Sequence, residues 1–551
     1  MKKRNGFTLI ELLAVIVILA VIALISTPIV LNIIDETKKG ALQNTAYGII
    51  EAGKLSYTDE MLETGKIDST AFTYVDGVET SNPSGKKLEY KGKKPESGTL
   101  VINDEGKIAL AIYYGNYCAE KGYDEIEPTI SEKTKEECNL IFNADLSGAS
   151  APKLSANMVP IKWDGTKWIK ADVNNILGDN QWYDYDKQEW ANVALINNSS
   201  RAIYVDASVG TAISEAQVMA YLVWVPRYRY KLFNVAGIVV PVQKIDVVFE
   251  TKTTTKSNGT TDGTYLTHPA FTFGTDELDG FWVGKFETTG DATTPTVKPN
   301  NIALTSQAIS AQFVTSKLFN TTTTYGLTNA NDAHLARSME WAAVGYLSQS
   351  DYGKYGNPMY TGAAGLEKDI YMNNLGTSSS GPSITGCAAN AVSTTELISA
   401  TCPSSNQYYT TQGVKASTTG NIYGIYDMVG GSWEPVMGAM YNSDNNTIML
   451  LNSGFDSATI NSASMSKYID KYTYGTTPTD QTAYNRKKLG DSTSETRNWT
   501  LNYSHMVYSS FPWVERGGRY ANGSYTGILG FYYSNGDSSA NRSFRTIIIG
   551  D

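Results

Sequence analysis

Four cysteines are the residues of this 551-residue chain best suited to metal, redox or nucleophilic chemistry. They fall in two pairs at short spacing, Cys118 with Cys138 and Cys387 with Cys402. Neither pair has the CxxC spacing of a zinc or redox site, and only three histidines are present to complete a metal cluster. We therefore expect two local disulfides in an exported protein.

The three histidines, His268, His334 and His505, are far apart in the sequence. We expect each to be a structural or surface residue rather than a catalytic base. The chain also shows no serine nucleophile elbow, paired-carboxylate signature or phosphate-binding loop. The residues alone therefore predict no enzyme site.

Side-chain oxygens gather at one place in the chain, in Asp172, Asn174, Asn175, Asp179 and Asn180. Such a group suggests a calcium-binding loop, but it lacks the spacing of an EF-hand. We expect no cofactor and no metal site, with a structural calcium ion as the alternative.

The overall composition indicates a folded, mildly acidic protein. The chain has 45 Lys and Arg against 55 Asp and Glu, which gives a net charge of −10. Because this balance provides no excess of positive charge to bind a phosphate backbone, we expect no nucleic-acid partner. Tyr is unusually frequent, with 36 residues beside 48 Gly. Tyr with Gly, Ser and Asn is typical of binding loops; the plainer alternative is a β-rich extracellular protein with many turns.

The N-terminus has a basic flank and then an apolar run. Lys2, Lys3 and Arg4 precede residues 7–34, whose one charge is Glu11, and this order predicts a cytoplasmic N-terminus. A cleaved secretory signal is disfavoured because no small-residue cleavage site follows and the helical periodicity continues. An ordinary membrane anchor leaves Glu11 unexplained, since a carboxylate at bilayer depth costs on the order of a few kcal/mol without a partner. The apolar positions that extend one long helix are Val30, Ile33, Ile34, Ala41, Leu42 and Ile49.

In this N-terminus, Gly6 is followed by the aromatic Phe7 and, four residues beyond, by Glu11. The pattern resembles the leader of type IV pilins and pseudopilins. The resemblance implies that a prepilin peptidase cuts between Gly6 and Phe7 and that the new amino terminus is usually methylated. The cut creates an ammonium group that can pair with Glu11 of a neighbouring subunit, so two buried charges are satisfied on assembly. Pro28 matches the helix-kinking proline of many pilins and is expected to bend or locally open the helix.

The same resemblance implies a place in the cell and a set of partners. We expect a transmembrane helix in the inner or cytoplasmic membrane before assembly, and afterwards contact with other pilin subunits on a pilus or at the bacterial surface.

Three further regions follow the leader at residues 1–6. Residues 7–145 are expected to form a pilin-like unit, in which TLVINDEGKIALAIYYGNYC predicts two strands around a turn of a small antiparallel sheet. Small residues and proline in Ser147–Ser155 indicate a linker. We expect residues 146–215 to form this linker and a small aromatic β connector, and residues 216–551 to form one large domain.

The large domain carries an ordered set of motifs. YLVWVPRYRYKL predicts a strand, HPAFTFGTDELDGFWVGKFE a further pair, and HLARSMEWAAVGYL an amphipathic helix. With the motifs that follow, the region resembles the formylglycine-generating-enzyme type of C-type lectin fold, so we expect an α+β protein with a large lectin-like head. The matching positions are Glu340, Trp341, Gly424 to Met428, Trp433, Glu434, Arg516 to Gly518, Phe544 and Arg545.

The resemblance implies, for an enzyme of that family, a pair of cysteines near the C-terminal end of the domain. The last cysteine of this chain is Cys402. We therefore predict that the domain is not an enzyme and uses the fold for binding.

The framework residues of that fold are expected to have structural duties. Gly517–Gly518 should permit tight backbone turns, and Trp433 should fill the core. Arg516 or Arg545 should pair with Glu434 or with backbone carbonyls.

Between the framework pieces lies Arg519–Ala540, a segment composed mainly of Tyr, Ser, Asn, Gly and Asp. It resembles the variable region of target proteins of diversity-generating retroelements, which implies a hypervariable binding surface; the alternative is an exposed, Tyr-rich terminal hairpin. The residues expected to contact a ligand are Arg519, Tyr520, Asn522, Ser524, Tyr525, Tyr532, Tyr533, Ser534, Asn535 and Asp537.

The sequence thus predicts a minor or tip pilin that binds a surface ligand, a protein or a glycan, through a lectin-like head. Two alternatives belong to other classes: a structural pseudopilin that primes filament assembly, and a divergent enzyme of the formylglycine-generating type.

Overall fold

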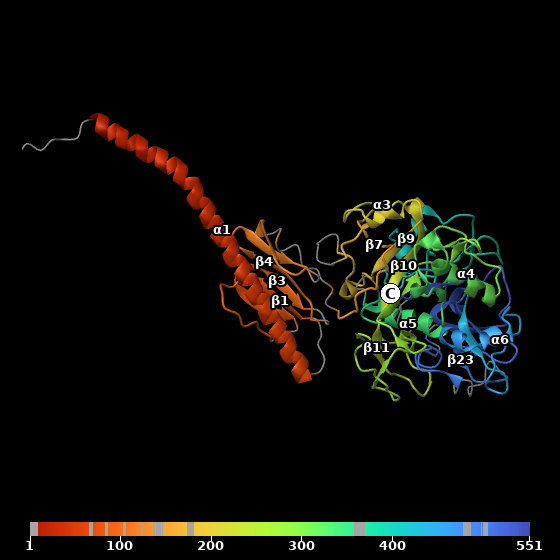
Figure 1. The fold of residues 1–551 in the computed structure, drawn as a ribbon. Helices are drawn as coiled ribbons and strands as arrows, with labels where there is room; N and C mark the ends of the chain where they lie inside the picture. Colours follow the sequence, from red (N-terminus) through yellow and green to blue (C-terminus); the bar gives the residue numbers. More distant parts are fainter. Residues whose placement is uncertain are drawn as a thin grey trace, which may run out of the picture. The chain divides into compact units, whose positions relative to one another are not determined.

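The computed structural model describes most of the chain, namely residues 9–64, 70–82, 86–102, 106–122, 125–135, 138, 145, 147–173, 181–356, 370–477, 486–497, 499 and 505–550. The chain divides into two compact units (Figure 1). We call residues 1–142 with 176–178 the stem unit, and residues 143–175 with 179–551 the head unit. Gly6 and Phe7, where processing is predicted, lie outside the described residues.

The stem unit begins with one continuous helix, α1 (Leu9–Thr64), as the apolar periodicity predicts. The helix continues through residue 28, so Pro28 does not end it, and Figure 1 shows that α1 is curved. Apolar side chains of its first half are exposed within this unit, with Leu9 at 86% and Leu24 at 78%. None of the described helices has both the length and the hydropathy of a membrane span, so the predicted transmembrane helix is not confirmed.

The second half of α1 covers an antiparallel sheet of order β2-β1-β3-β4-β5-β6. Its strands are β1 (Thr70–Val75), β2 (Val78–Asn82), β3 (Ser97–Ile102), β4 (Ile108–Tyr114), β5 (Tyr117–Lys121) and β6 (Thr129–Glu132). Leu42 and Ile49 of α1 are buried against Leu100 and Leu110 of the sheet. The predicted hairpin is present as β3 and β4, and the disulfide Cys118–Cys138 forms at the end of the unit.

The head unit is built around a seven-stranded antiparallel sheet of order β19-β26-β16-β10-β9-β7-β8. Its strands are β7 (Met158–Trp163), β8 (Trp168–Lys170), β9 (Asn192–Ile196), β10 (Val218–Pro226), β16 (Gly280–Gly284), β19 (His334–Leu335) and β26 (Thr546–Ile548). Strands from the predicted connector, residues 146–215, therefore belong to the same sheet as β10. Their buried aromatic and aliphatic residues complete the head core, so this segment is no separate β module.

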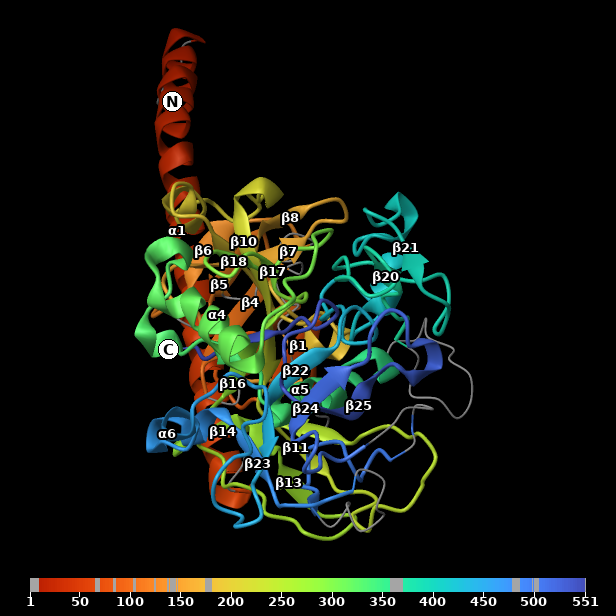
Figure 2. The ribbon, with the colours of Figure 1, turned by 90° about the vertical axis from the view of Figure 1, so that its right-hand side faces the viewer.

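A second sheet of order β23-β22-β24-β25 carries the C-terminal segment (Figure 2). Its strands are β22 (Glu434–Met440), β23 (Asp470–Tyr472), β24 (Trp513–Gly517) and β25 (Gly527–Ser534). Short strands form the remaining sheets: β11 (Tyr228–Lys231), β12 (Val247–Phe249), β13 (Tyr265–Thr267), β14 (Thr272–Phe273), β15 (Asp276–Glu277), β17 (Thr289–Gly290), β18 (Pro295–Thr296), β20 (Leu375–Gly376) and β21 (Leu397–Ile398). The arrangement is α+β, as expected.

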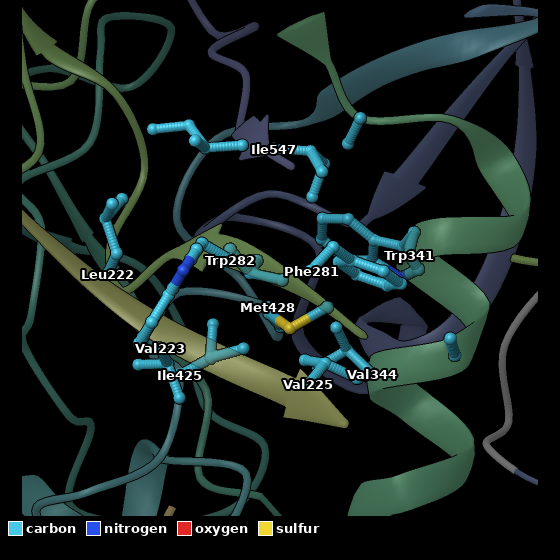
Figure 3. Packing of buried hydrophobic residues seen from close by; sticks show 14 of the residues in the cluster. Leu222, Val223, Val225, Phe281, Trp282, Trp341, Val344, Ile425, Met428 and Ile547 are labelled. Carbon is cyan, nitrogen blue, oxygen red and sulfur yellow. The ribbon is translucent and has the colours of Figure 1, made fainter. Parts of the chain in front are cut away.

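The described helices of the head are short. They are α3 (Arg201–Val205), α4 (Ile309–Thr321), α5 (Ser338–Ser348) and α6 (Ser457–Ile460). The sequence predicted an amphipathic α5, but every one of its residues is buried, because β22, β25 and other parts of the head pack around the helix. Figure 3 shows Trp341 and Val344 of α5 packed towards Phe281 and Val225 of the seven-stranded sheet.

One buried ion pair ties the last strand to the second sheet. Arg545 donates to Glu434 at 2.6 Å, and both side chains are 1% exposed. Burial raises the pKa of Glu434 to about 7, and Arg545 opposes this rise. The arginine also donates to the carbonyls of Gly284 and Tyr426. The predicted pairing of Arg545 with Glu434 is confirmed.

We predict that Arg545→Met lowers the free energy of unfolding of the head by about 3 kcal/mol, because it leaves Glu434 buried without its partner. All ten tryptophans lie between residues 163 and 513, so denaturant unfolding followed by tryptophan fluorescence measures the head alone. Lys244→Met is the matched control, since it breaks an exposed pair with Asp351 and should cost less than about 1 kcal/mol. Equal losses in the two variants would contradict the assignment.

Candidate ligand-binding surface

The predicted binding segment comprises the turn after β24, strand β25 and the loop that follows. β24 and β25 pair antiparallel, with Trp513 opposite Ser534 and Glu515 opposite Tyr532. Gly517 and Gly518 end β24 at φ values of +81° and +78°. A Cβ atom on Gly518 would lie 2.8 Å from Thr526, so glycine is needed here, as the sequence suggested.

The side chain of Arg516, which is fully buried, connects this pair of strands to the segments packed against them. Its guanidinium donates to the carbonyls of Gly530 at 3.1 Å and Asp491 at 2.8 Å, and to Ser338 Oγ at 2.9 Å. The predicted pairing of Arg516 with backbone carbonyls is therefore confirmed. It positions Phe531, whose ring centre lies 4.6 Å from the guanidinium carbon.

Tyr520 was expected to contact a ligand, but it is completely buried. Its hydroxyl donates to the carbonyls of Ser378 at 2.6 Å and Gly381 at 3.0 Å. Ser378 and Gly381 lie in the loop between β20 and Cys387, whose disulfide with Cys402 is the second predicted disulfide. Tyr520 therefore anchors the turn to this loop and presents no surface to a ligand.

The end of the segment is also partly structural. Ser534 is fully buried, and its Oγ accepts from Gly536 N at 3.2 Å, so a ligand contact does not fit this residue either. Asn535 Oδ1 accepts from Asp537 N at 3.3 Å. Asp537 pairs with Arg542, which also donates to Glu515 at 2.8 Å.

Two tyrosines of β25 belong to a group of stacked rings. Tyr532 lies parallel to Trp433 with ring centres 5.3 Å apart, and parallel to Tyr533 at 4.4 Å. The sequence placed Trp433 in the core, but the side chain is only half-buried because it stacks on the strand surface.

Three aromatic side chains from the segment that precedes β24 extend this group of rings. His505 contacts Tyr532 edge-on at 5.6 Å, while Tyr508 and Phe511 lie 5.0 and 5.3 Å from the ring of Tyr533. The sequence predicts His505 as a structural or surface residue and assigns Tyr508 and Phe511 no role. The signal that could have found them is the group of aromatic residues just before β24.

A pocket of about 220 Å³ opens beside the stacked rings. Its lining residues are Trp433, Gly518, Asn522, Tyr525, Gly530, Phe531 and Tyr532. Tyr525 is 48% exposed, and Asn522 Oδ1 accepts from the backbone N–H of Arg519 at 2.9 Å, which fixes the turn.

Of the predicted contact residues, Asn522, Tyr525 and Tyr532 thus meet at one pocket. The others that reach the surface without lining it are Arg519, Ser524, Tyr533, Asn535 and Asp537.

The surroundings of the pocket are close to neutral. No described residue that lines it is charged. Burial raises the pKa of Tyr533 to about 12 and lowers the pKa of His505, so both are uncharged at pH 7. Burial also raises the pKa of Glu515, and the neighbouring Arg542 opposes this rise.

The acid groups that approach closely among the described residues lie elsewhere, in Asp145, Asp184 and Asp186. Asp184 already pairs with Lys187 at 2.6 Å. In the predicted calcium loop, Asp172 is buried, while Asn174, Asn175, Asp179 and Asn180 lie outside the described residues.

In a comparison with known families, residues 1–27 match the prokaryotic N-terminal methylation motif. The match supports a type IV pilin-type N-terminus, and with it a surface or pilus protein that a prepilin peptidase processes and that assembles with other subunits. Glu11 lies within the matched residues. No curated protein matches the chain.

We predict that Tyr520→Phe lowers the free energy of unfolding of the head by about 1–2 kcal/mol, because the carbonyls of Ser378 and Gly381, the second of them buried, lose the hydroxyl that they share. Backbone amides of the turn at residues 519–526 should exchange with solvent faster in hydrogen-exchange mass spectrometry. Tyr409→Phe, at a tyrosine that is 45% exposed, is the control and should change neither quantity. Unchanged exchange in Tyr520→Phe would refute the anchoring role.

Proposed function

We propose that the chain is a minor or tip subunit of a pilin-type surface structure, and that its head binds a ligand in the aromatic pocket. The stack of Trp433 on Tyr532 beside a pocket of about 220 Å³ is the observation that carries the binding function. Rigid aromatic side chains on a fixed strand provide large contact area with little loss of entropy. The proposed mechanism is recognition without chemistry.

Exposed apolar residues along α1 support assembly with other subunits. Leu9, Leu24 and Ile33 are 86%, 78% and 60% exposed, and a continuous apolar surface of this kind calls for cover by other molecules. In the proposed scheme this surface lies in the membrane before assembly and against neighbouring subunits afterwards. A head of this size would crowd the side of a filament, which favours a minor or tip position.

The presence and the lining of the pocket favour a binding function over the two alternative functions. A subunit that only primes assembly needs no aromatic pocket on its head. The divergent-enzyme alternative needs reactive groups, whereas the described lining offers an amide, phenols and an indole. If the segment is diversified, substitution at its half-exposed positions would alter the pocket and leave the buried anchors Arg516, Tyr520 and Phe531 in place.

We predict that Glu11→Ala reduces incorporation into sheared filaments by about tenfold or more, because the amino terminus of the neighbouring subunit loses its partner. Mass spectrometry of sheared filaments, compared with whole cells, measures this ratio. Glu63→Ala, at an exposed position of the same helix, is the control and should incorporate normally. Normal incorporation of Glu11→Ala would contradict the pairing.

We predict that Trp433→Ala with Tyr532→Ala reduces retention of the labelled full chain on a panel of bacterial and host cells by about tenfold or more. Point variants are required, because deleting residues 519–540 would remove β25 from the sheet. Tyr409→Ala is the matched control, since this exposed tyrosine also stacks on a tryptophan, Trp163, at another place on the head. A wild-type chain that binds no surface, or a double variant that binds normally, would refute the proposal.

A further inference from the structure

We infer that the pocket takes a neutral sugar ring of a surface glycan. This inference rests on the proposed binding function and names the class of ligand. It depends on three properties of the pocket: its size, its lack of charge, and the arrangement of rings and polar groups around it.

The volume of about 220 Å³ is below the range of pockets that enclose drug-sized molecules, roughly 300–1,000 Å³, so it suits a single ring. A pyranose has an apolar C–H face and a rim of hydroxyl groups. Trp433 and Tyr532 both line the pocket, and the aromatic surface that their stacking leaves uncovered can pack against such a face, while Tyr525 brings a phenol to the same pocket.

The row of rings continues beyond the pocket. Tyr533 stacks on Tyr532 at 4.4 Å, and Tyr508 and Phe511 follow it. A chain of linked sugar rings could contact this row after its first ring has entered the pocket, whereas a single amino-acid side chain would use the pocket alone.

Asn522 distinguishes a sugar from a purely apolar group. Its Oδ1 already accepts from Arg519 N, so its amide N–H groups are the part that can donate to a ligand. A sugar hydroxyl can accept such a bond, while an aliphatic side chain in the same place would leave the amide without a partner and lose affinity.

The charges near the pocket favour a neutral ligand. Arg542 is paired with Glu515 and Asp537, and Arg519, which keeps its charge, donates to the carbonyl of Ser379 at 3.3 Å and does not line the pocket. The described lining itself offers no cation for a carboxylate, sulfate or phosphate group. A uronic acid, sialic acid or sulfated sugar would therefore lose its hydration without gaining an ion pair.

The test is binding of the purified full chain to an array of neutral and acidic oligosaccharides, followed by titration with the best neutral probe. Tyr532→Ala should weaken binding about tenfold through the lost stacking. Asn522→Asp should weaken it by a similar factor, because the carboxylate still accepts from Arg519 N but no longer donates. Tyr409→Ala should bind as the wild type does.

The outcomes separate this inference from the proposed function. Cells that retain the wild-type chain are treated with periodate, which cleaves vicinal diols of sugars, or with protease. Loss of retention after periodate, with neutral probes bound on the array, supports a sugar. Retention that survives periodate but not protease, or an array that responds only to acidic probes, overturns the sugar assignment and leaves the proposed function standing. If the double variant Trp433→Ala with Tyr532→Ala still adheres to untreated cells, the proposed function itself fails.

Discussion

The pocket depends on one buried cation. Arg516 has no exposed surface, and its guanidinium joins β25 through Gly530, the preceding loop through Asp491, and the start of α5 through Ser338. A buried guanidinium without acceptors would cost several kcal/mol, so the folded head must keep acceptors from these segments around it. They set the position of Phe531, and because Tyr532 follows directly in the strand, they also set the ring that stacks on Trp433.

Local patterns in the sequence were sufficient to predict those structural features whose contacts are local or belong to a motif. The hairpin of β3 and β4, both disulfides, the continuous helix α1 and the turn at Gly517–Gly518 all follow from residues close together in the chain. The pairing of Arg545 with Glu434 spans 111 residues and was predictable only because two framework motifs carry them.

Long-range contacts account for what the sequence could not predict. Each residue of α5 is buried because strands from distant parts of the chain cover it, and periodicity within eleven residues cannot reveal that cover. The connector reads as short aromatic strands, yet it completes the seven-stranded sheet of the head. Tyr520 and Tyr525 are indistinguishable by type, but a loop more than a hundred residues away, at residues 378–381, covers the first and leaves the second 48% exposed.

Composition therefore located the proposed binding segment but did not show which of its tyrosines are buried anchors and which face a ligand. Tyrosine suits both, because its ring packs in a core and its hydroxyl either satisfies a buried carbonyl, as in Tyr520, or faces a ligand. The segment alternates between anchors that the scaffold needs and rings that the surface offers, within one strand and its flanking turns. A binding surface built this way keeps its shape before a ligand arrives, since the anchors hold the backbone. Less conformational entropy is then lost on association, which is the condition under which a small neutral pocket can bind with useful affinity.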